Sequence, residues 1–342
     1  MEFANPARAP YTAHDRALIG AGHARQARAR IARHPRYRPT PLRAIPGLAG
    51  ALAADIKDES GRMGLGSFKA LGGAYAVHLL AEREPGGAPF VCASAGNHGI
   101  SVASGAAEAG VPCVVHLSES VPETFADRLR GLGAEVRRSG RDYDDSMAAA
   151  RRDAERHGLR LVSDSSWPGY TEIPLEVMRG YSVLVDEAAD AGGPYTHVFV
   201  QAGVGGLAAA AAGYVRDRWG EQPKIVVVEP ESAACLLESA RAGEPVRLPP
   251  SRTALGRLDC REPSLIAHHL LRTLADLYIT VTDEQAEQAA RLLAGHGVHL
   301  SGCGAAGAAG LLHLSSAARA ALALDGTSRV LLVGTEGRME PE

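Results

Sequence analysis

Lys69 is the residue around which we expect the chemistry of this chain to be organised. It follows Ser67 and Phe68 and leads into a small-residue segment that predicts a helix over residues 70–80. A lysine in the first turn of a helix meets the positive end of the helix dipole, and burial would favour its neutral form further. A neutral lysine amine can form an imine with a carbonyl group. A surface lysine at an ordinary helix start is the open alternative for this tripeptide alone.

Three further segments place small or polar residues directly after a predicted strand. Residues 94–99 (S-A-G-N-H-G) offer N–H groups, a hydroxyl and an amide, which suit a substrate carboxylate. Residues 203–207 (G-V-G-G-L) can wrap a phosphate at the start of a helix. In residues 334–337 (G-T-E-G), the Thr335 hydroxyl can face a pyridine nitrogen as a neutral partner. Taken singly, each segment also fits a helix cap or a tight turn.

The elements that must position these segments are short strands rich in Val, Ile and Leu, which alternate with helices. This alternation predicts an α/β protein with buried parallel sheets. Residues 245–257, rich in Pro and Arg, are predicted to be an exposed loop. The predicted strands cover residues 54–59, 89–93, 111–117, 134–136, 159–163, 196–201, 224–229 and 329–333; the main predicted helices cover residues 16–34, 70–80, 123–131, 143–157 and 172–189, with another from residue 283.

Composition excludes several classes of function. The chain has 342 residues, enough for one or two domains, and a net charge of -3, which gives no electrostatic basis for binding nucleic acid or a membrane. We find no signal-peptide pattern and no apolar stretch of membrane-spanning length, so a cytoplasmic location is expected. The five cysteines are scattered without a C-x-x-C pair, and no histidines have carboxylate companions at ligand spacing, so neither a disulfide framework nor a metal site is predicted.

The order lysine, Asn loop, glycine-rich loop and C-terminal hydroxyl resembles the fold type II pyridoxal-phosphate enzymes, the tryptophan synthase β-subunit-like group. Within that group the chain is similar to the diaminopropionate ammonia-lyase family. The similar segments are residues 41–48 (PLRAIPGL), 64–75 (GLGSFKALGGAY), 164–174 (DSSWPGYTEIP) and 335–337 (TEG). The resemblance implies two domains, each with a mostly parallel sheet flanked by helices, and a homodimer. Residues 1–85 plus 171–342 would form the large cofactor-binding domain, and residues 86–170 a smaller domain that closes over the cofactor cleft.

The resemblance also implies roles for individual residues. Lys69 would form the Schiff base with pyridoxal 5'-phosphate and remove the Cα proton of an L-amino acid. Asn97 would contact the ring O3′, and Thr335 would face the ring nitrogen. Asp164 would lie by the distal group of the substrate, although a cap of the following turn explains it equally well. The phosphate-binding residues would be Gly203, Val204, Gly205, Gly206 and Leu207, and the substrate-binding residues Ser94, Ala95, Gly96, His98 and Asp164.

Several positions depart from the family's pattern. Ala95 stands where the family has the aspartate that acts as base for D-isomers, so turnover of a D-substrate by that route is not expected. Gly302 and Cys303 replace Glu and Ser in the family's G-E-S-G-A-A-G stretch, and Ile100 stands where a basic residue is common. The extra room expected at Ala95 and Gly302 favours a bulkier substrate or an incoming nucleophile.

The implied function is α,β-elimination on a small β-substituted L-amino acid such as 2,3-diaminopropionate, giving a 2-oxo acid and ammonia. Within the same fold, β-replacement, serine or threonine dehydration and racemisation are alternatives. A homologue that binds the cofactor without turnover is a further alternative. A nicotinamide-dependent oxidoreductase is disfavoured, because the glycine-rich loop lacks the third glycine and the distal acidic residue of a dinucleotide site.

Overall fold

A seven-stranded sheet and a four-stranded sheet carry the fold in the computed structural model, which describes residues 1–94 and 96–338. In the larger sheet the inner strands run parallel, and only the edge strands β1 and β2 pair antiparallel. Its order is β1 (Glu2–Ala4), β10 (Leu277–Val281), β9 (Lys224–Pro230), β8 (His197–Gln201), β11 (Arg329–Gly334), β3 (Ala53–Asp58) and β2 (Leu42–Ala44).

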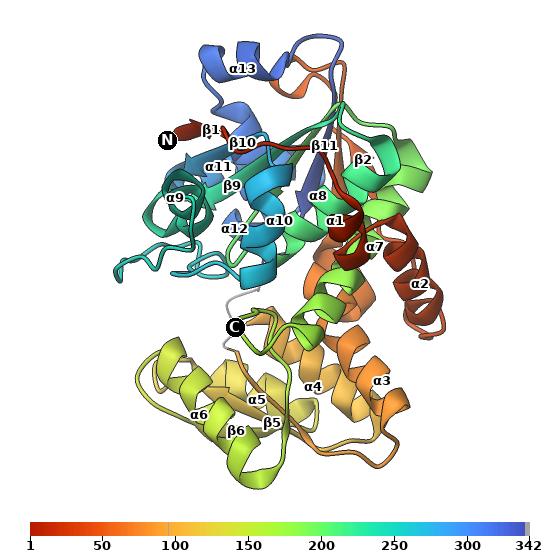
Figure 1. The fold of residues 1–342 in the computed structure, drawn as a ribbon, viewed down its shortest axis with the longest axis vertical. Helices are drawn as coiled ribbons and strands as arrows, with labels where there is room; N and C mark the ends of the chain where they lie inside the picture. The colour runs from red at the N-terminus through yellow and green to blue at the C-terminus, as the bar shows by residue number, and fades with distance from the viewer. Residues whose placement is uncertain (95, 339–342) are drawn as a thin grey trace.

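The smaller sheet is parallel throughout and lies at the opposite end of the molecule from α13 (Ser316–Leu322) (Figure 1). Its order is β6 (Glu135–Arg138), β5 (Cys113–Leu117), β4 (Phe90–Ala93) and β7 (Arg160–Leu161). All four strands fall inside residues 86–170, the segment predicted to form the smaller domain. The predicted domain boundaries themselves stay a prediction.

Helices cover both sheets, as the alternation of strands and helices predicts. No helix in the described part of the chain is both long and apolar enough to cross a membrane. The helices not yet named are α1 (Ala13–Leu18), α2 (Ala21–Ile31), α3 (Gly73–Arg83), α4 (Asn97–Ala109), α5 (Glu123–Gly131), α6 (Tyr143–His157), α7 (Glu172–Gly192), α8 (Gly206–Trp219), α9 (Cys235–Ala242), α10 (Leu265–Leu274), α11 (Asp283–Gly295) and α12 (Gly302–Leu312).

The helices α8 and α12 pack closely on the larger sheet because they are built from alanine and glycine. All five alanines in residues 208–212 of α8 are fully buried, and α12 is buried over residues 302–311. A Cβ atom on Gly307 would lie 2.8 Å from the Gln201 side chain at the end of β8. Both helices therefore begin close to the carboxyl ends of the central strands.

Several element boundaries differ from the sequence predictions; the helix predicted over residues 70–80, for example, is α3 and begins at Gly73. Two longer segments also differ. Residues 16–34 do not form one helix: α1 ends before Gly20, where a Cβ atom would lie 2.9 Å from the Asp217 carboxylate. That carboxylate accepts a hydrogen bond from the Ala21 amide and so begins a new helix. Residues 245–257 are mostly exposed, as predicted, but Leu255 is buried and Arg257 reaches the site described next.

Candidate active site

A cavity of about 260 Å³ lies where several strands of the two sheets end. Its lining includes Ala93 at the end of β4, Gln201 at the end of β8 and Thr335 just after β11. In open α/β sheets, ligands bind outside the carboxyl ends of the strands, where loops and helix N-termini converge. This cavity is therefore the candidate active site.

Lys69 enters the cavity from a short 3-10 helix (Phe68–Leu71) that is tied down on both sides. The Phe68 amide donates to the Thr335 carbonyl at 3.0 Å. The Ser101 hydroxyl of α4 donates to the Lys69 carbonyl at 2.7 Å. The lysine backbone is thus fixed against both the larger sheet and the helix that follows the Asn loop.

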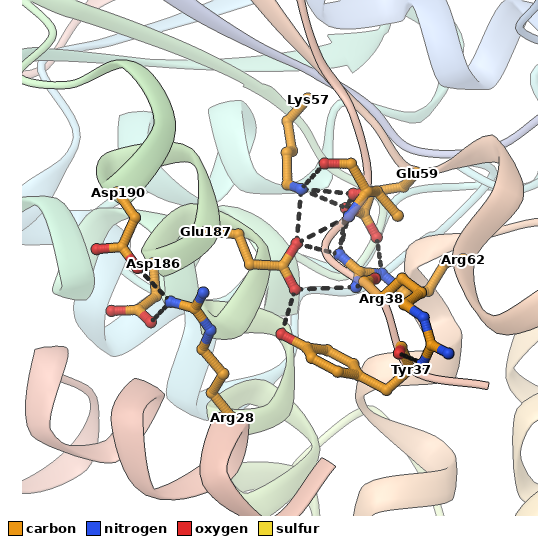
Figure 2. A network of polar contacts seen from close by, with 10 residues as sticks. Arg28, Tyr37, Arg38, Lys57, Glu59, Arg62, Asp186, Glu187 and Asp190 are labelled. Carbon is orange, nitrogen blue, oxygen red and sulfur yellow. Dashed lines mark hydrogen bonds and ion pairs between the residues drawn. The ribbon is translucent and has the colours of Figure 1, made fainter. Parts of the chain in front are cut away.

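A buried ion cluster of Lys57, Glu59, Arg62 and Glu187 anchors the loop that precedes Lys69 (Figure 2). The Glu187 carboxylate on α7 lies 2.6 Å from Lys57 Nζ and 2.7 Å from Arg62 Nη2. All four side chains are at most 1% exposed. Met63, next in the chain, has a φ of 51°, a conformation that a non-glycine residue adopts only when its surroundings impose it. The cluster therefore fixes the path of the chain towards Lys69.

Inside the cavity, the Lys69 ammonium donates a hydrogen bond to the Asp164 carboxylate. Burial alone would lower the pKa of Lys69, but the Asp164 charge reverses the effect and raises this pKa above its ordinary value. For Asp164, burial would raise the pKa, and the Lys69 charge lowers it instead. The expectation of a lysine with a lowered pKa is wrong for this arrangement, because a helix start predicts nothing about a carboxylate 95 residues away.

Asn97 and Thr335 lie on the cavity wall with their polar groups held by neighbours. The Asn97 amide donates to the Glu336 carboxylate, and the Gln201 amide donates to the Thr335 hydroxyl at 3.0 Å. The other Glu336 oxygen accepts from the Ser301 hydroxyl at 2.8 Å. Burial raises the pKa of Glu336, with Arg257 acting in the opposite direction. A carboxylate thus orients the amide that was predicted to contact a cofactor ring.

The glycine-rich loop forms a backbone cradle at the N-terminus of α8. Gly205 has a φ of 94°, and a Cβ atom there would lie 2.9 Å from Leu236. A Cβ atom on Gly203 would lie 2.8 Å from the Cys260 sulfur. Only glycine fits at these two positions, and free N–H groups at a helix N-terminus bind phosphate. Together with an amine on Lys69 and a neutral hydroxyl on Thr335, this donor set fits pyridoxal phosphate.

The structure brings nearly all of the predicted site residues to this one cavity. Ala95 lies outside the described residues. Gly302 is buried and does not line the cavity, and a Cβ atom on it would lie 2.8 Å from Glu287, so the extra room predicted there is wrong. Ile100 is buried in the core. The predicted residues that line the cavity are Lys69, Ser94, Gly96, Asn97, His98, Asp164, Gly203, Val204, Gly205, Gly206, Leu207 and Thr335.

Several cavity residues were not predicted from the sequence. The Tyr181 ring packs edge-on against Phe68, with 4.8 Å between the ring centres, and its centre lies 5.3 Å from the Lys69 ammonium. Glu336 had a signal, since it stands inside the T-E-G segment. Tyr181 had none, because it sits within a long amphipathic helix. The unpredicted lining residues also include Tyr143, Gln201, Arg257, Leu258, Asp259 and Cys260.

Comparisons with known proteins show which family the chain is similar to. Residues 34–336, which include every site residue predicted from the sequence, match the family described as pyridoxal-phosphate dependent enzyme. Diaminopropionate ammonia-lyase of Escherichia coli (strain K12) is 35% identical over 283 residues, covering 75% of this chain and 71% of that protein. The Salmonella typhimurium (strain LT2) protein of that name is 34% identical over 353 residues, covering 90% of this chain and 87% of that protein. The crystal structure of the Escherichia coli enzyme with an aminoacrylate-PLP azomethine reaction intermediate superposes with a TM-score of 0.90 at 32% identity, covering 98% of this chain and 93% of that one.

Proposed function

The chain belongs to the pyridoxal-phosphate dependent enzymes and, within them, to the diaminopropionate ammonia-lyase family; we propose that it converts L-2,3-diaminopropionate into a 2-oxo acid and ammonia. The observation that carries this proposal is the ion pair of Lys69 with Asp164 beside the glycine cradle. It places the lysine nitrogen, a carboxylate that can bind an ammonium group and a phosphate site in one cavity.

The reaction breaks two bonds in the substrate. Lys69, as the free amine, takes the proton from Cα. The electron pair left behind forms the Cα–Cβ double bond as the Cβ–N bond breaks with its pair on nitrogen, so the β-ammonium group leaves as ammonia. Water hydrolyses the unsaturated amine to the 2-oxo acid and a second ammonia. Bound pyridoxal phosphate supplies the conjugated ring that accepts the Cα electron pair.

The residues of this chain are proposed to divide the remaining work. The N–H groups of residues 203–207 hold the cofactor phosphate, and Thr335 faces the ring nitrogen with a neutral hydroxyl. Asn97 contacts the ring O3′ while Glu336 holds its amide in place. The loop formed by Ser94, Gly96 and His98 lines the substrate end of the cavity.

An assay of wild type, Lys69→Ala and Lys224→Ala tests this proposal. Each protein, loaded with pyridoxal phosphate, is incubated with L-2,3-diaminopropionate, and 2-oxo acid and ammonia are measured. Wild type and the remote Lys224→Ala variant should release two ammonia per 2-oxo acid, while Lys69→Ala should lose at least roughly a thousandfold in rate. No 2-oxo acid from wild type would overturn the proposal, and product formed only with an added nucleophile would indicate β-replacement.

We further propose a cytoplasmic homodimer, as the family resemblance implies. Light scattering of the eluting protein should give twice the chain mass of 35.7 kDa. Elution at the mass of one chain would contradict the dimer.

A further inference from the structure

His98 lines the cavity, and one of its ring nitrogens, Nδ1, is buried without a hydrogen-bond partner among the described residues. Its Nε2 lies 3.0 Å from the Val162 carbonyl oxygen, which can only accept, so Nε2 carries the proton. Burial lowers the pKa of His98, with Asp164 opposing this effect, and the ring is neutral. Nδ1 is therefore a lone-pair acceptor.

The bare nitrogen lies beside a second acceptor. His98 Nδ1 is 4.0 Å from Asp164 Oδ2, and both side chains line the cavity. An ionised carboxylate can only accept hydrogen bonds. A neutral imidazole nitrogen next to a carboxylate calls for a ligand that donates to both. A buried acceptor left without a donor costs free energy, so the unpartnered Nδ1 favours a ligand that donates to it.

An ammonium group meets this demand, and the structure already shows one at Asp164. The Lys69 ammonium is bonded to the carboxylate. If Lys69 were bonded to the cofactor while the substrate enters, its ammonium charge would be gone and Asp164 would be open to another cation. The β-ammonium of the proposed substrate carries three N–H bonds and can donate to Asp164 and His98 together. A β-hydroxyl has one O–H and can satisfy only one of the two acceptors.

We propose that His98 Nδ1 and Asp164 form an ammonium subsite in which His98 sets the preference for a β-amino over a β-hydroxyl substrate. This inference rests on the proposed function and deepens it. It assigns His98 a specificity-determining contact with the leaving group, in addition to its bond with Val162.

Two substitutions of His98 test the roles of its two ring nitrogens separately. A glutamine amide reaches the position of Nε2, so His98→Gln keeps a donor for Val162 but removes the acceptor beside Asp164. An asparagine amide reaches the position of Nδ1, so His98→Asn keeps an acceptor there and gives up the Val162 bond. His268→Gln is the matched control, since His268 is also buried with an unpartnered nitrogen but does not line the cavity.

The measured quantity is kcat/KM for L-2,3-diaminopropionate divided by kcat/KM for L-serine. We expect this ratio to fall roughly 10- to 100-fold in His98→Gln, the worth of one hydrogen bond to a charged group, and to stay near wild type in His98→Asn and His268→Gln. An unchanged ratio in a folded His98→Gln protein that turns over the diamine would overturn the inference and leave the proposed function standing. If wild type turns over neither substrate, the proposed function fails and the inference with it.

A second readout needs no turnover. Nitrogen-15 NMR of the cofactor-free protein should show His98 neutral near pH 7 with its proton on Nε2. A proton on Nδ1 would make that nitrogen a donor and would overturn the subsite whatever the kinetics show.

Discussion

Lys69 and Asp164 form an ion pair inside the cavity although 95 positions separate them in the chain. The lysine comes from the segment after β3, and the carboxylate comes from the segment between β7 and α7. The Lys69 ammonium also lies 5.2 Å from the centre of the Phe68 ring and 5.3 Å from that of Tyr181. Lys69 is thus held as a cation by one carboxylate and two aromatic rings.

Replacing the Asp164 carboxylate should therefore change the pKa of Lys69. In Asp164→Asn, burial is no longer opposed by the Asp164 charge, so the pKa of Lys69 should fall below its ordinary value. NMR titration of carbon-13-labelled lysine in the cofactor-free protein measures this pKa. We also expect kcat/KM for L-2,3-diaminopropionate to drop roughly 10²- to 10⁴-fold. The exposed Asp127→Asn variant should leave both quantities unchanged; an unshifted Lys69 pKa in Asp164→Asn would refute the coupling.

The glycine cradle gives a second prediction, with a matched control. Gly205→Ala and Gly243→Ala both place a side chain at positive φ, 94° and 78°, which costs about 1–2 kcal/mol of folding free energy. At Gly205 the added Cβ atom would also lie 2.9 Å from Leu236 and 3.0 Å from Ala267, so the loop must shift, whereas at Gly243 it would meet nothing within 4 Å. Loss of one phosphate hydrogen bond would then raise the Kd for pyridoxal phosphate roughly 10- to 100-fold. Equal cofactor affinity in the two variants, measured by titration, would argue against phosphate binding at this loop.

For the buried ion cluster of Figure 2, we expect the losses of unfolding free energy in single and double variants to be strongly non-additive. Arg62→Met leaves Glu187 and Glu59 without their main partner in a site closed to water, and should destabilise the fold by about 3–5 kcal/mol. In the double variant with Arg62→Met and Glu187→Met, Lys57 Nζ still lies 3.8 Å from the Glu59 carboxylate. The double variant should therefore lose less free energy of unfolding than the two single variants lose in sum. Urea unfolding measures these free energies. The surface variant Arg130→Met should leave the free energy of unfolding close to that of wild type, because exposed ion pairs contribute little. Additive losses within the cluster would contradict its role as one unit.

Much of the fold follows from local patterns, and those predictions are confirmed. The predicted helix at residues 143–157 matches α6 because Asp142 caps its first turn and Gly158 ends it in a left-handed conformation. By contrast, α12 was not predicted: it is buried over residues 302–311 and therefore shows no amphipathic period. Strand β10 also escaped prediction, although its alternation of apolar and polar residues is typical of a strand.

The location of residues at the cavity was predictable where one short segment carries its own chemistry, as around Lys69, Asn97 and Gly205. It was not predictable where chemistry arises from contacts between distant segments. Arg257 belongs to a segment that composition describes as an exposed loop, yet its Nε lies 3.9 Å from Glu336. The reversal of the Lys69 pKa has the same origin, because the partner comes from another part of the chain.

Glu229 gives the last prediction, because it is a fully buried carboxyl outside the cavity. Burial raises its pKa from 4.5 to about 8, against the opposing hydrogen bonds from the Leu236 and Leu237 amides. The native state then keeps a proton that the unfolded chain loses above pH 4.5. Stability should fall as pH rises between these two values, by at most about 1.4 kcal/mol per pH unit, and level off above them. In urea unfolding from pH 5 to pH 9, Glu229→Gln should show a shallower decline than wild type, whereas the exposed Glu155→Gln should follow wild type. Parallel declines in wild type and Glu229→Gln would mean that Glu229 is ionised in the folded protein and acts as a charged cap for α9.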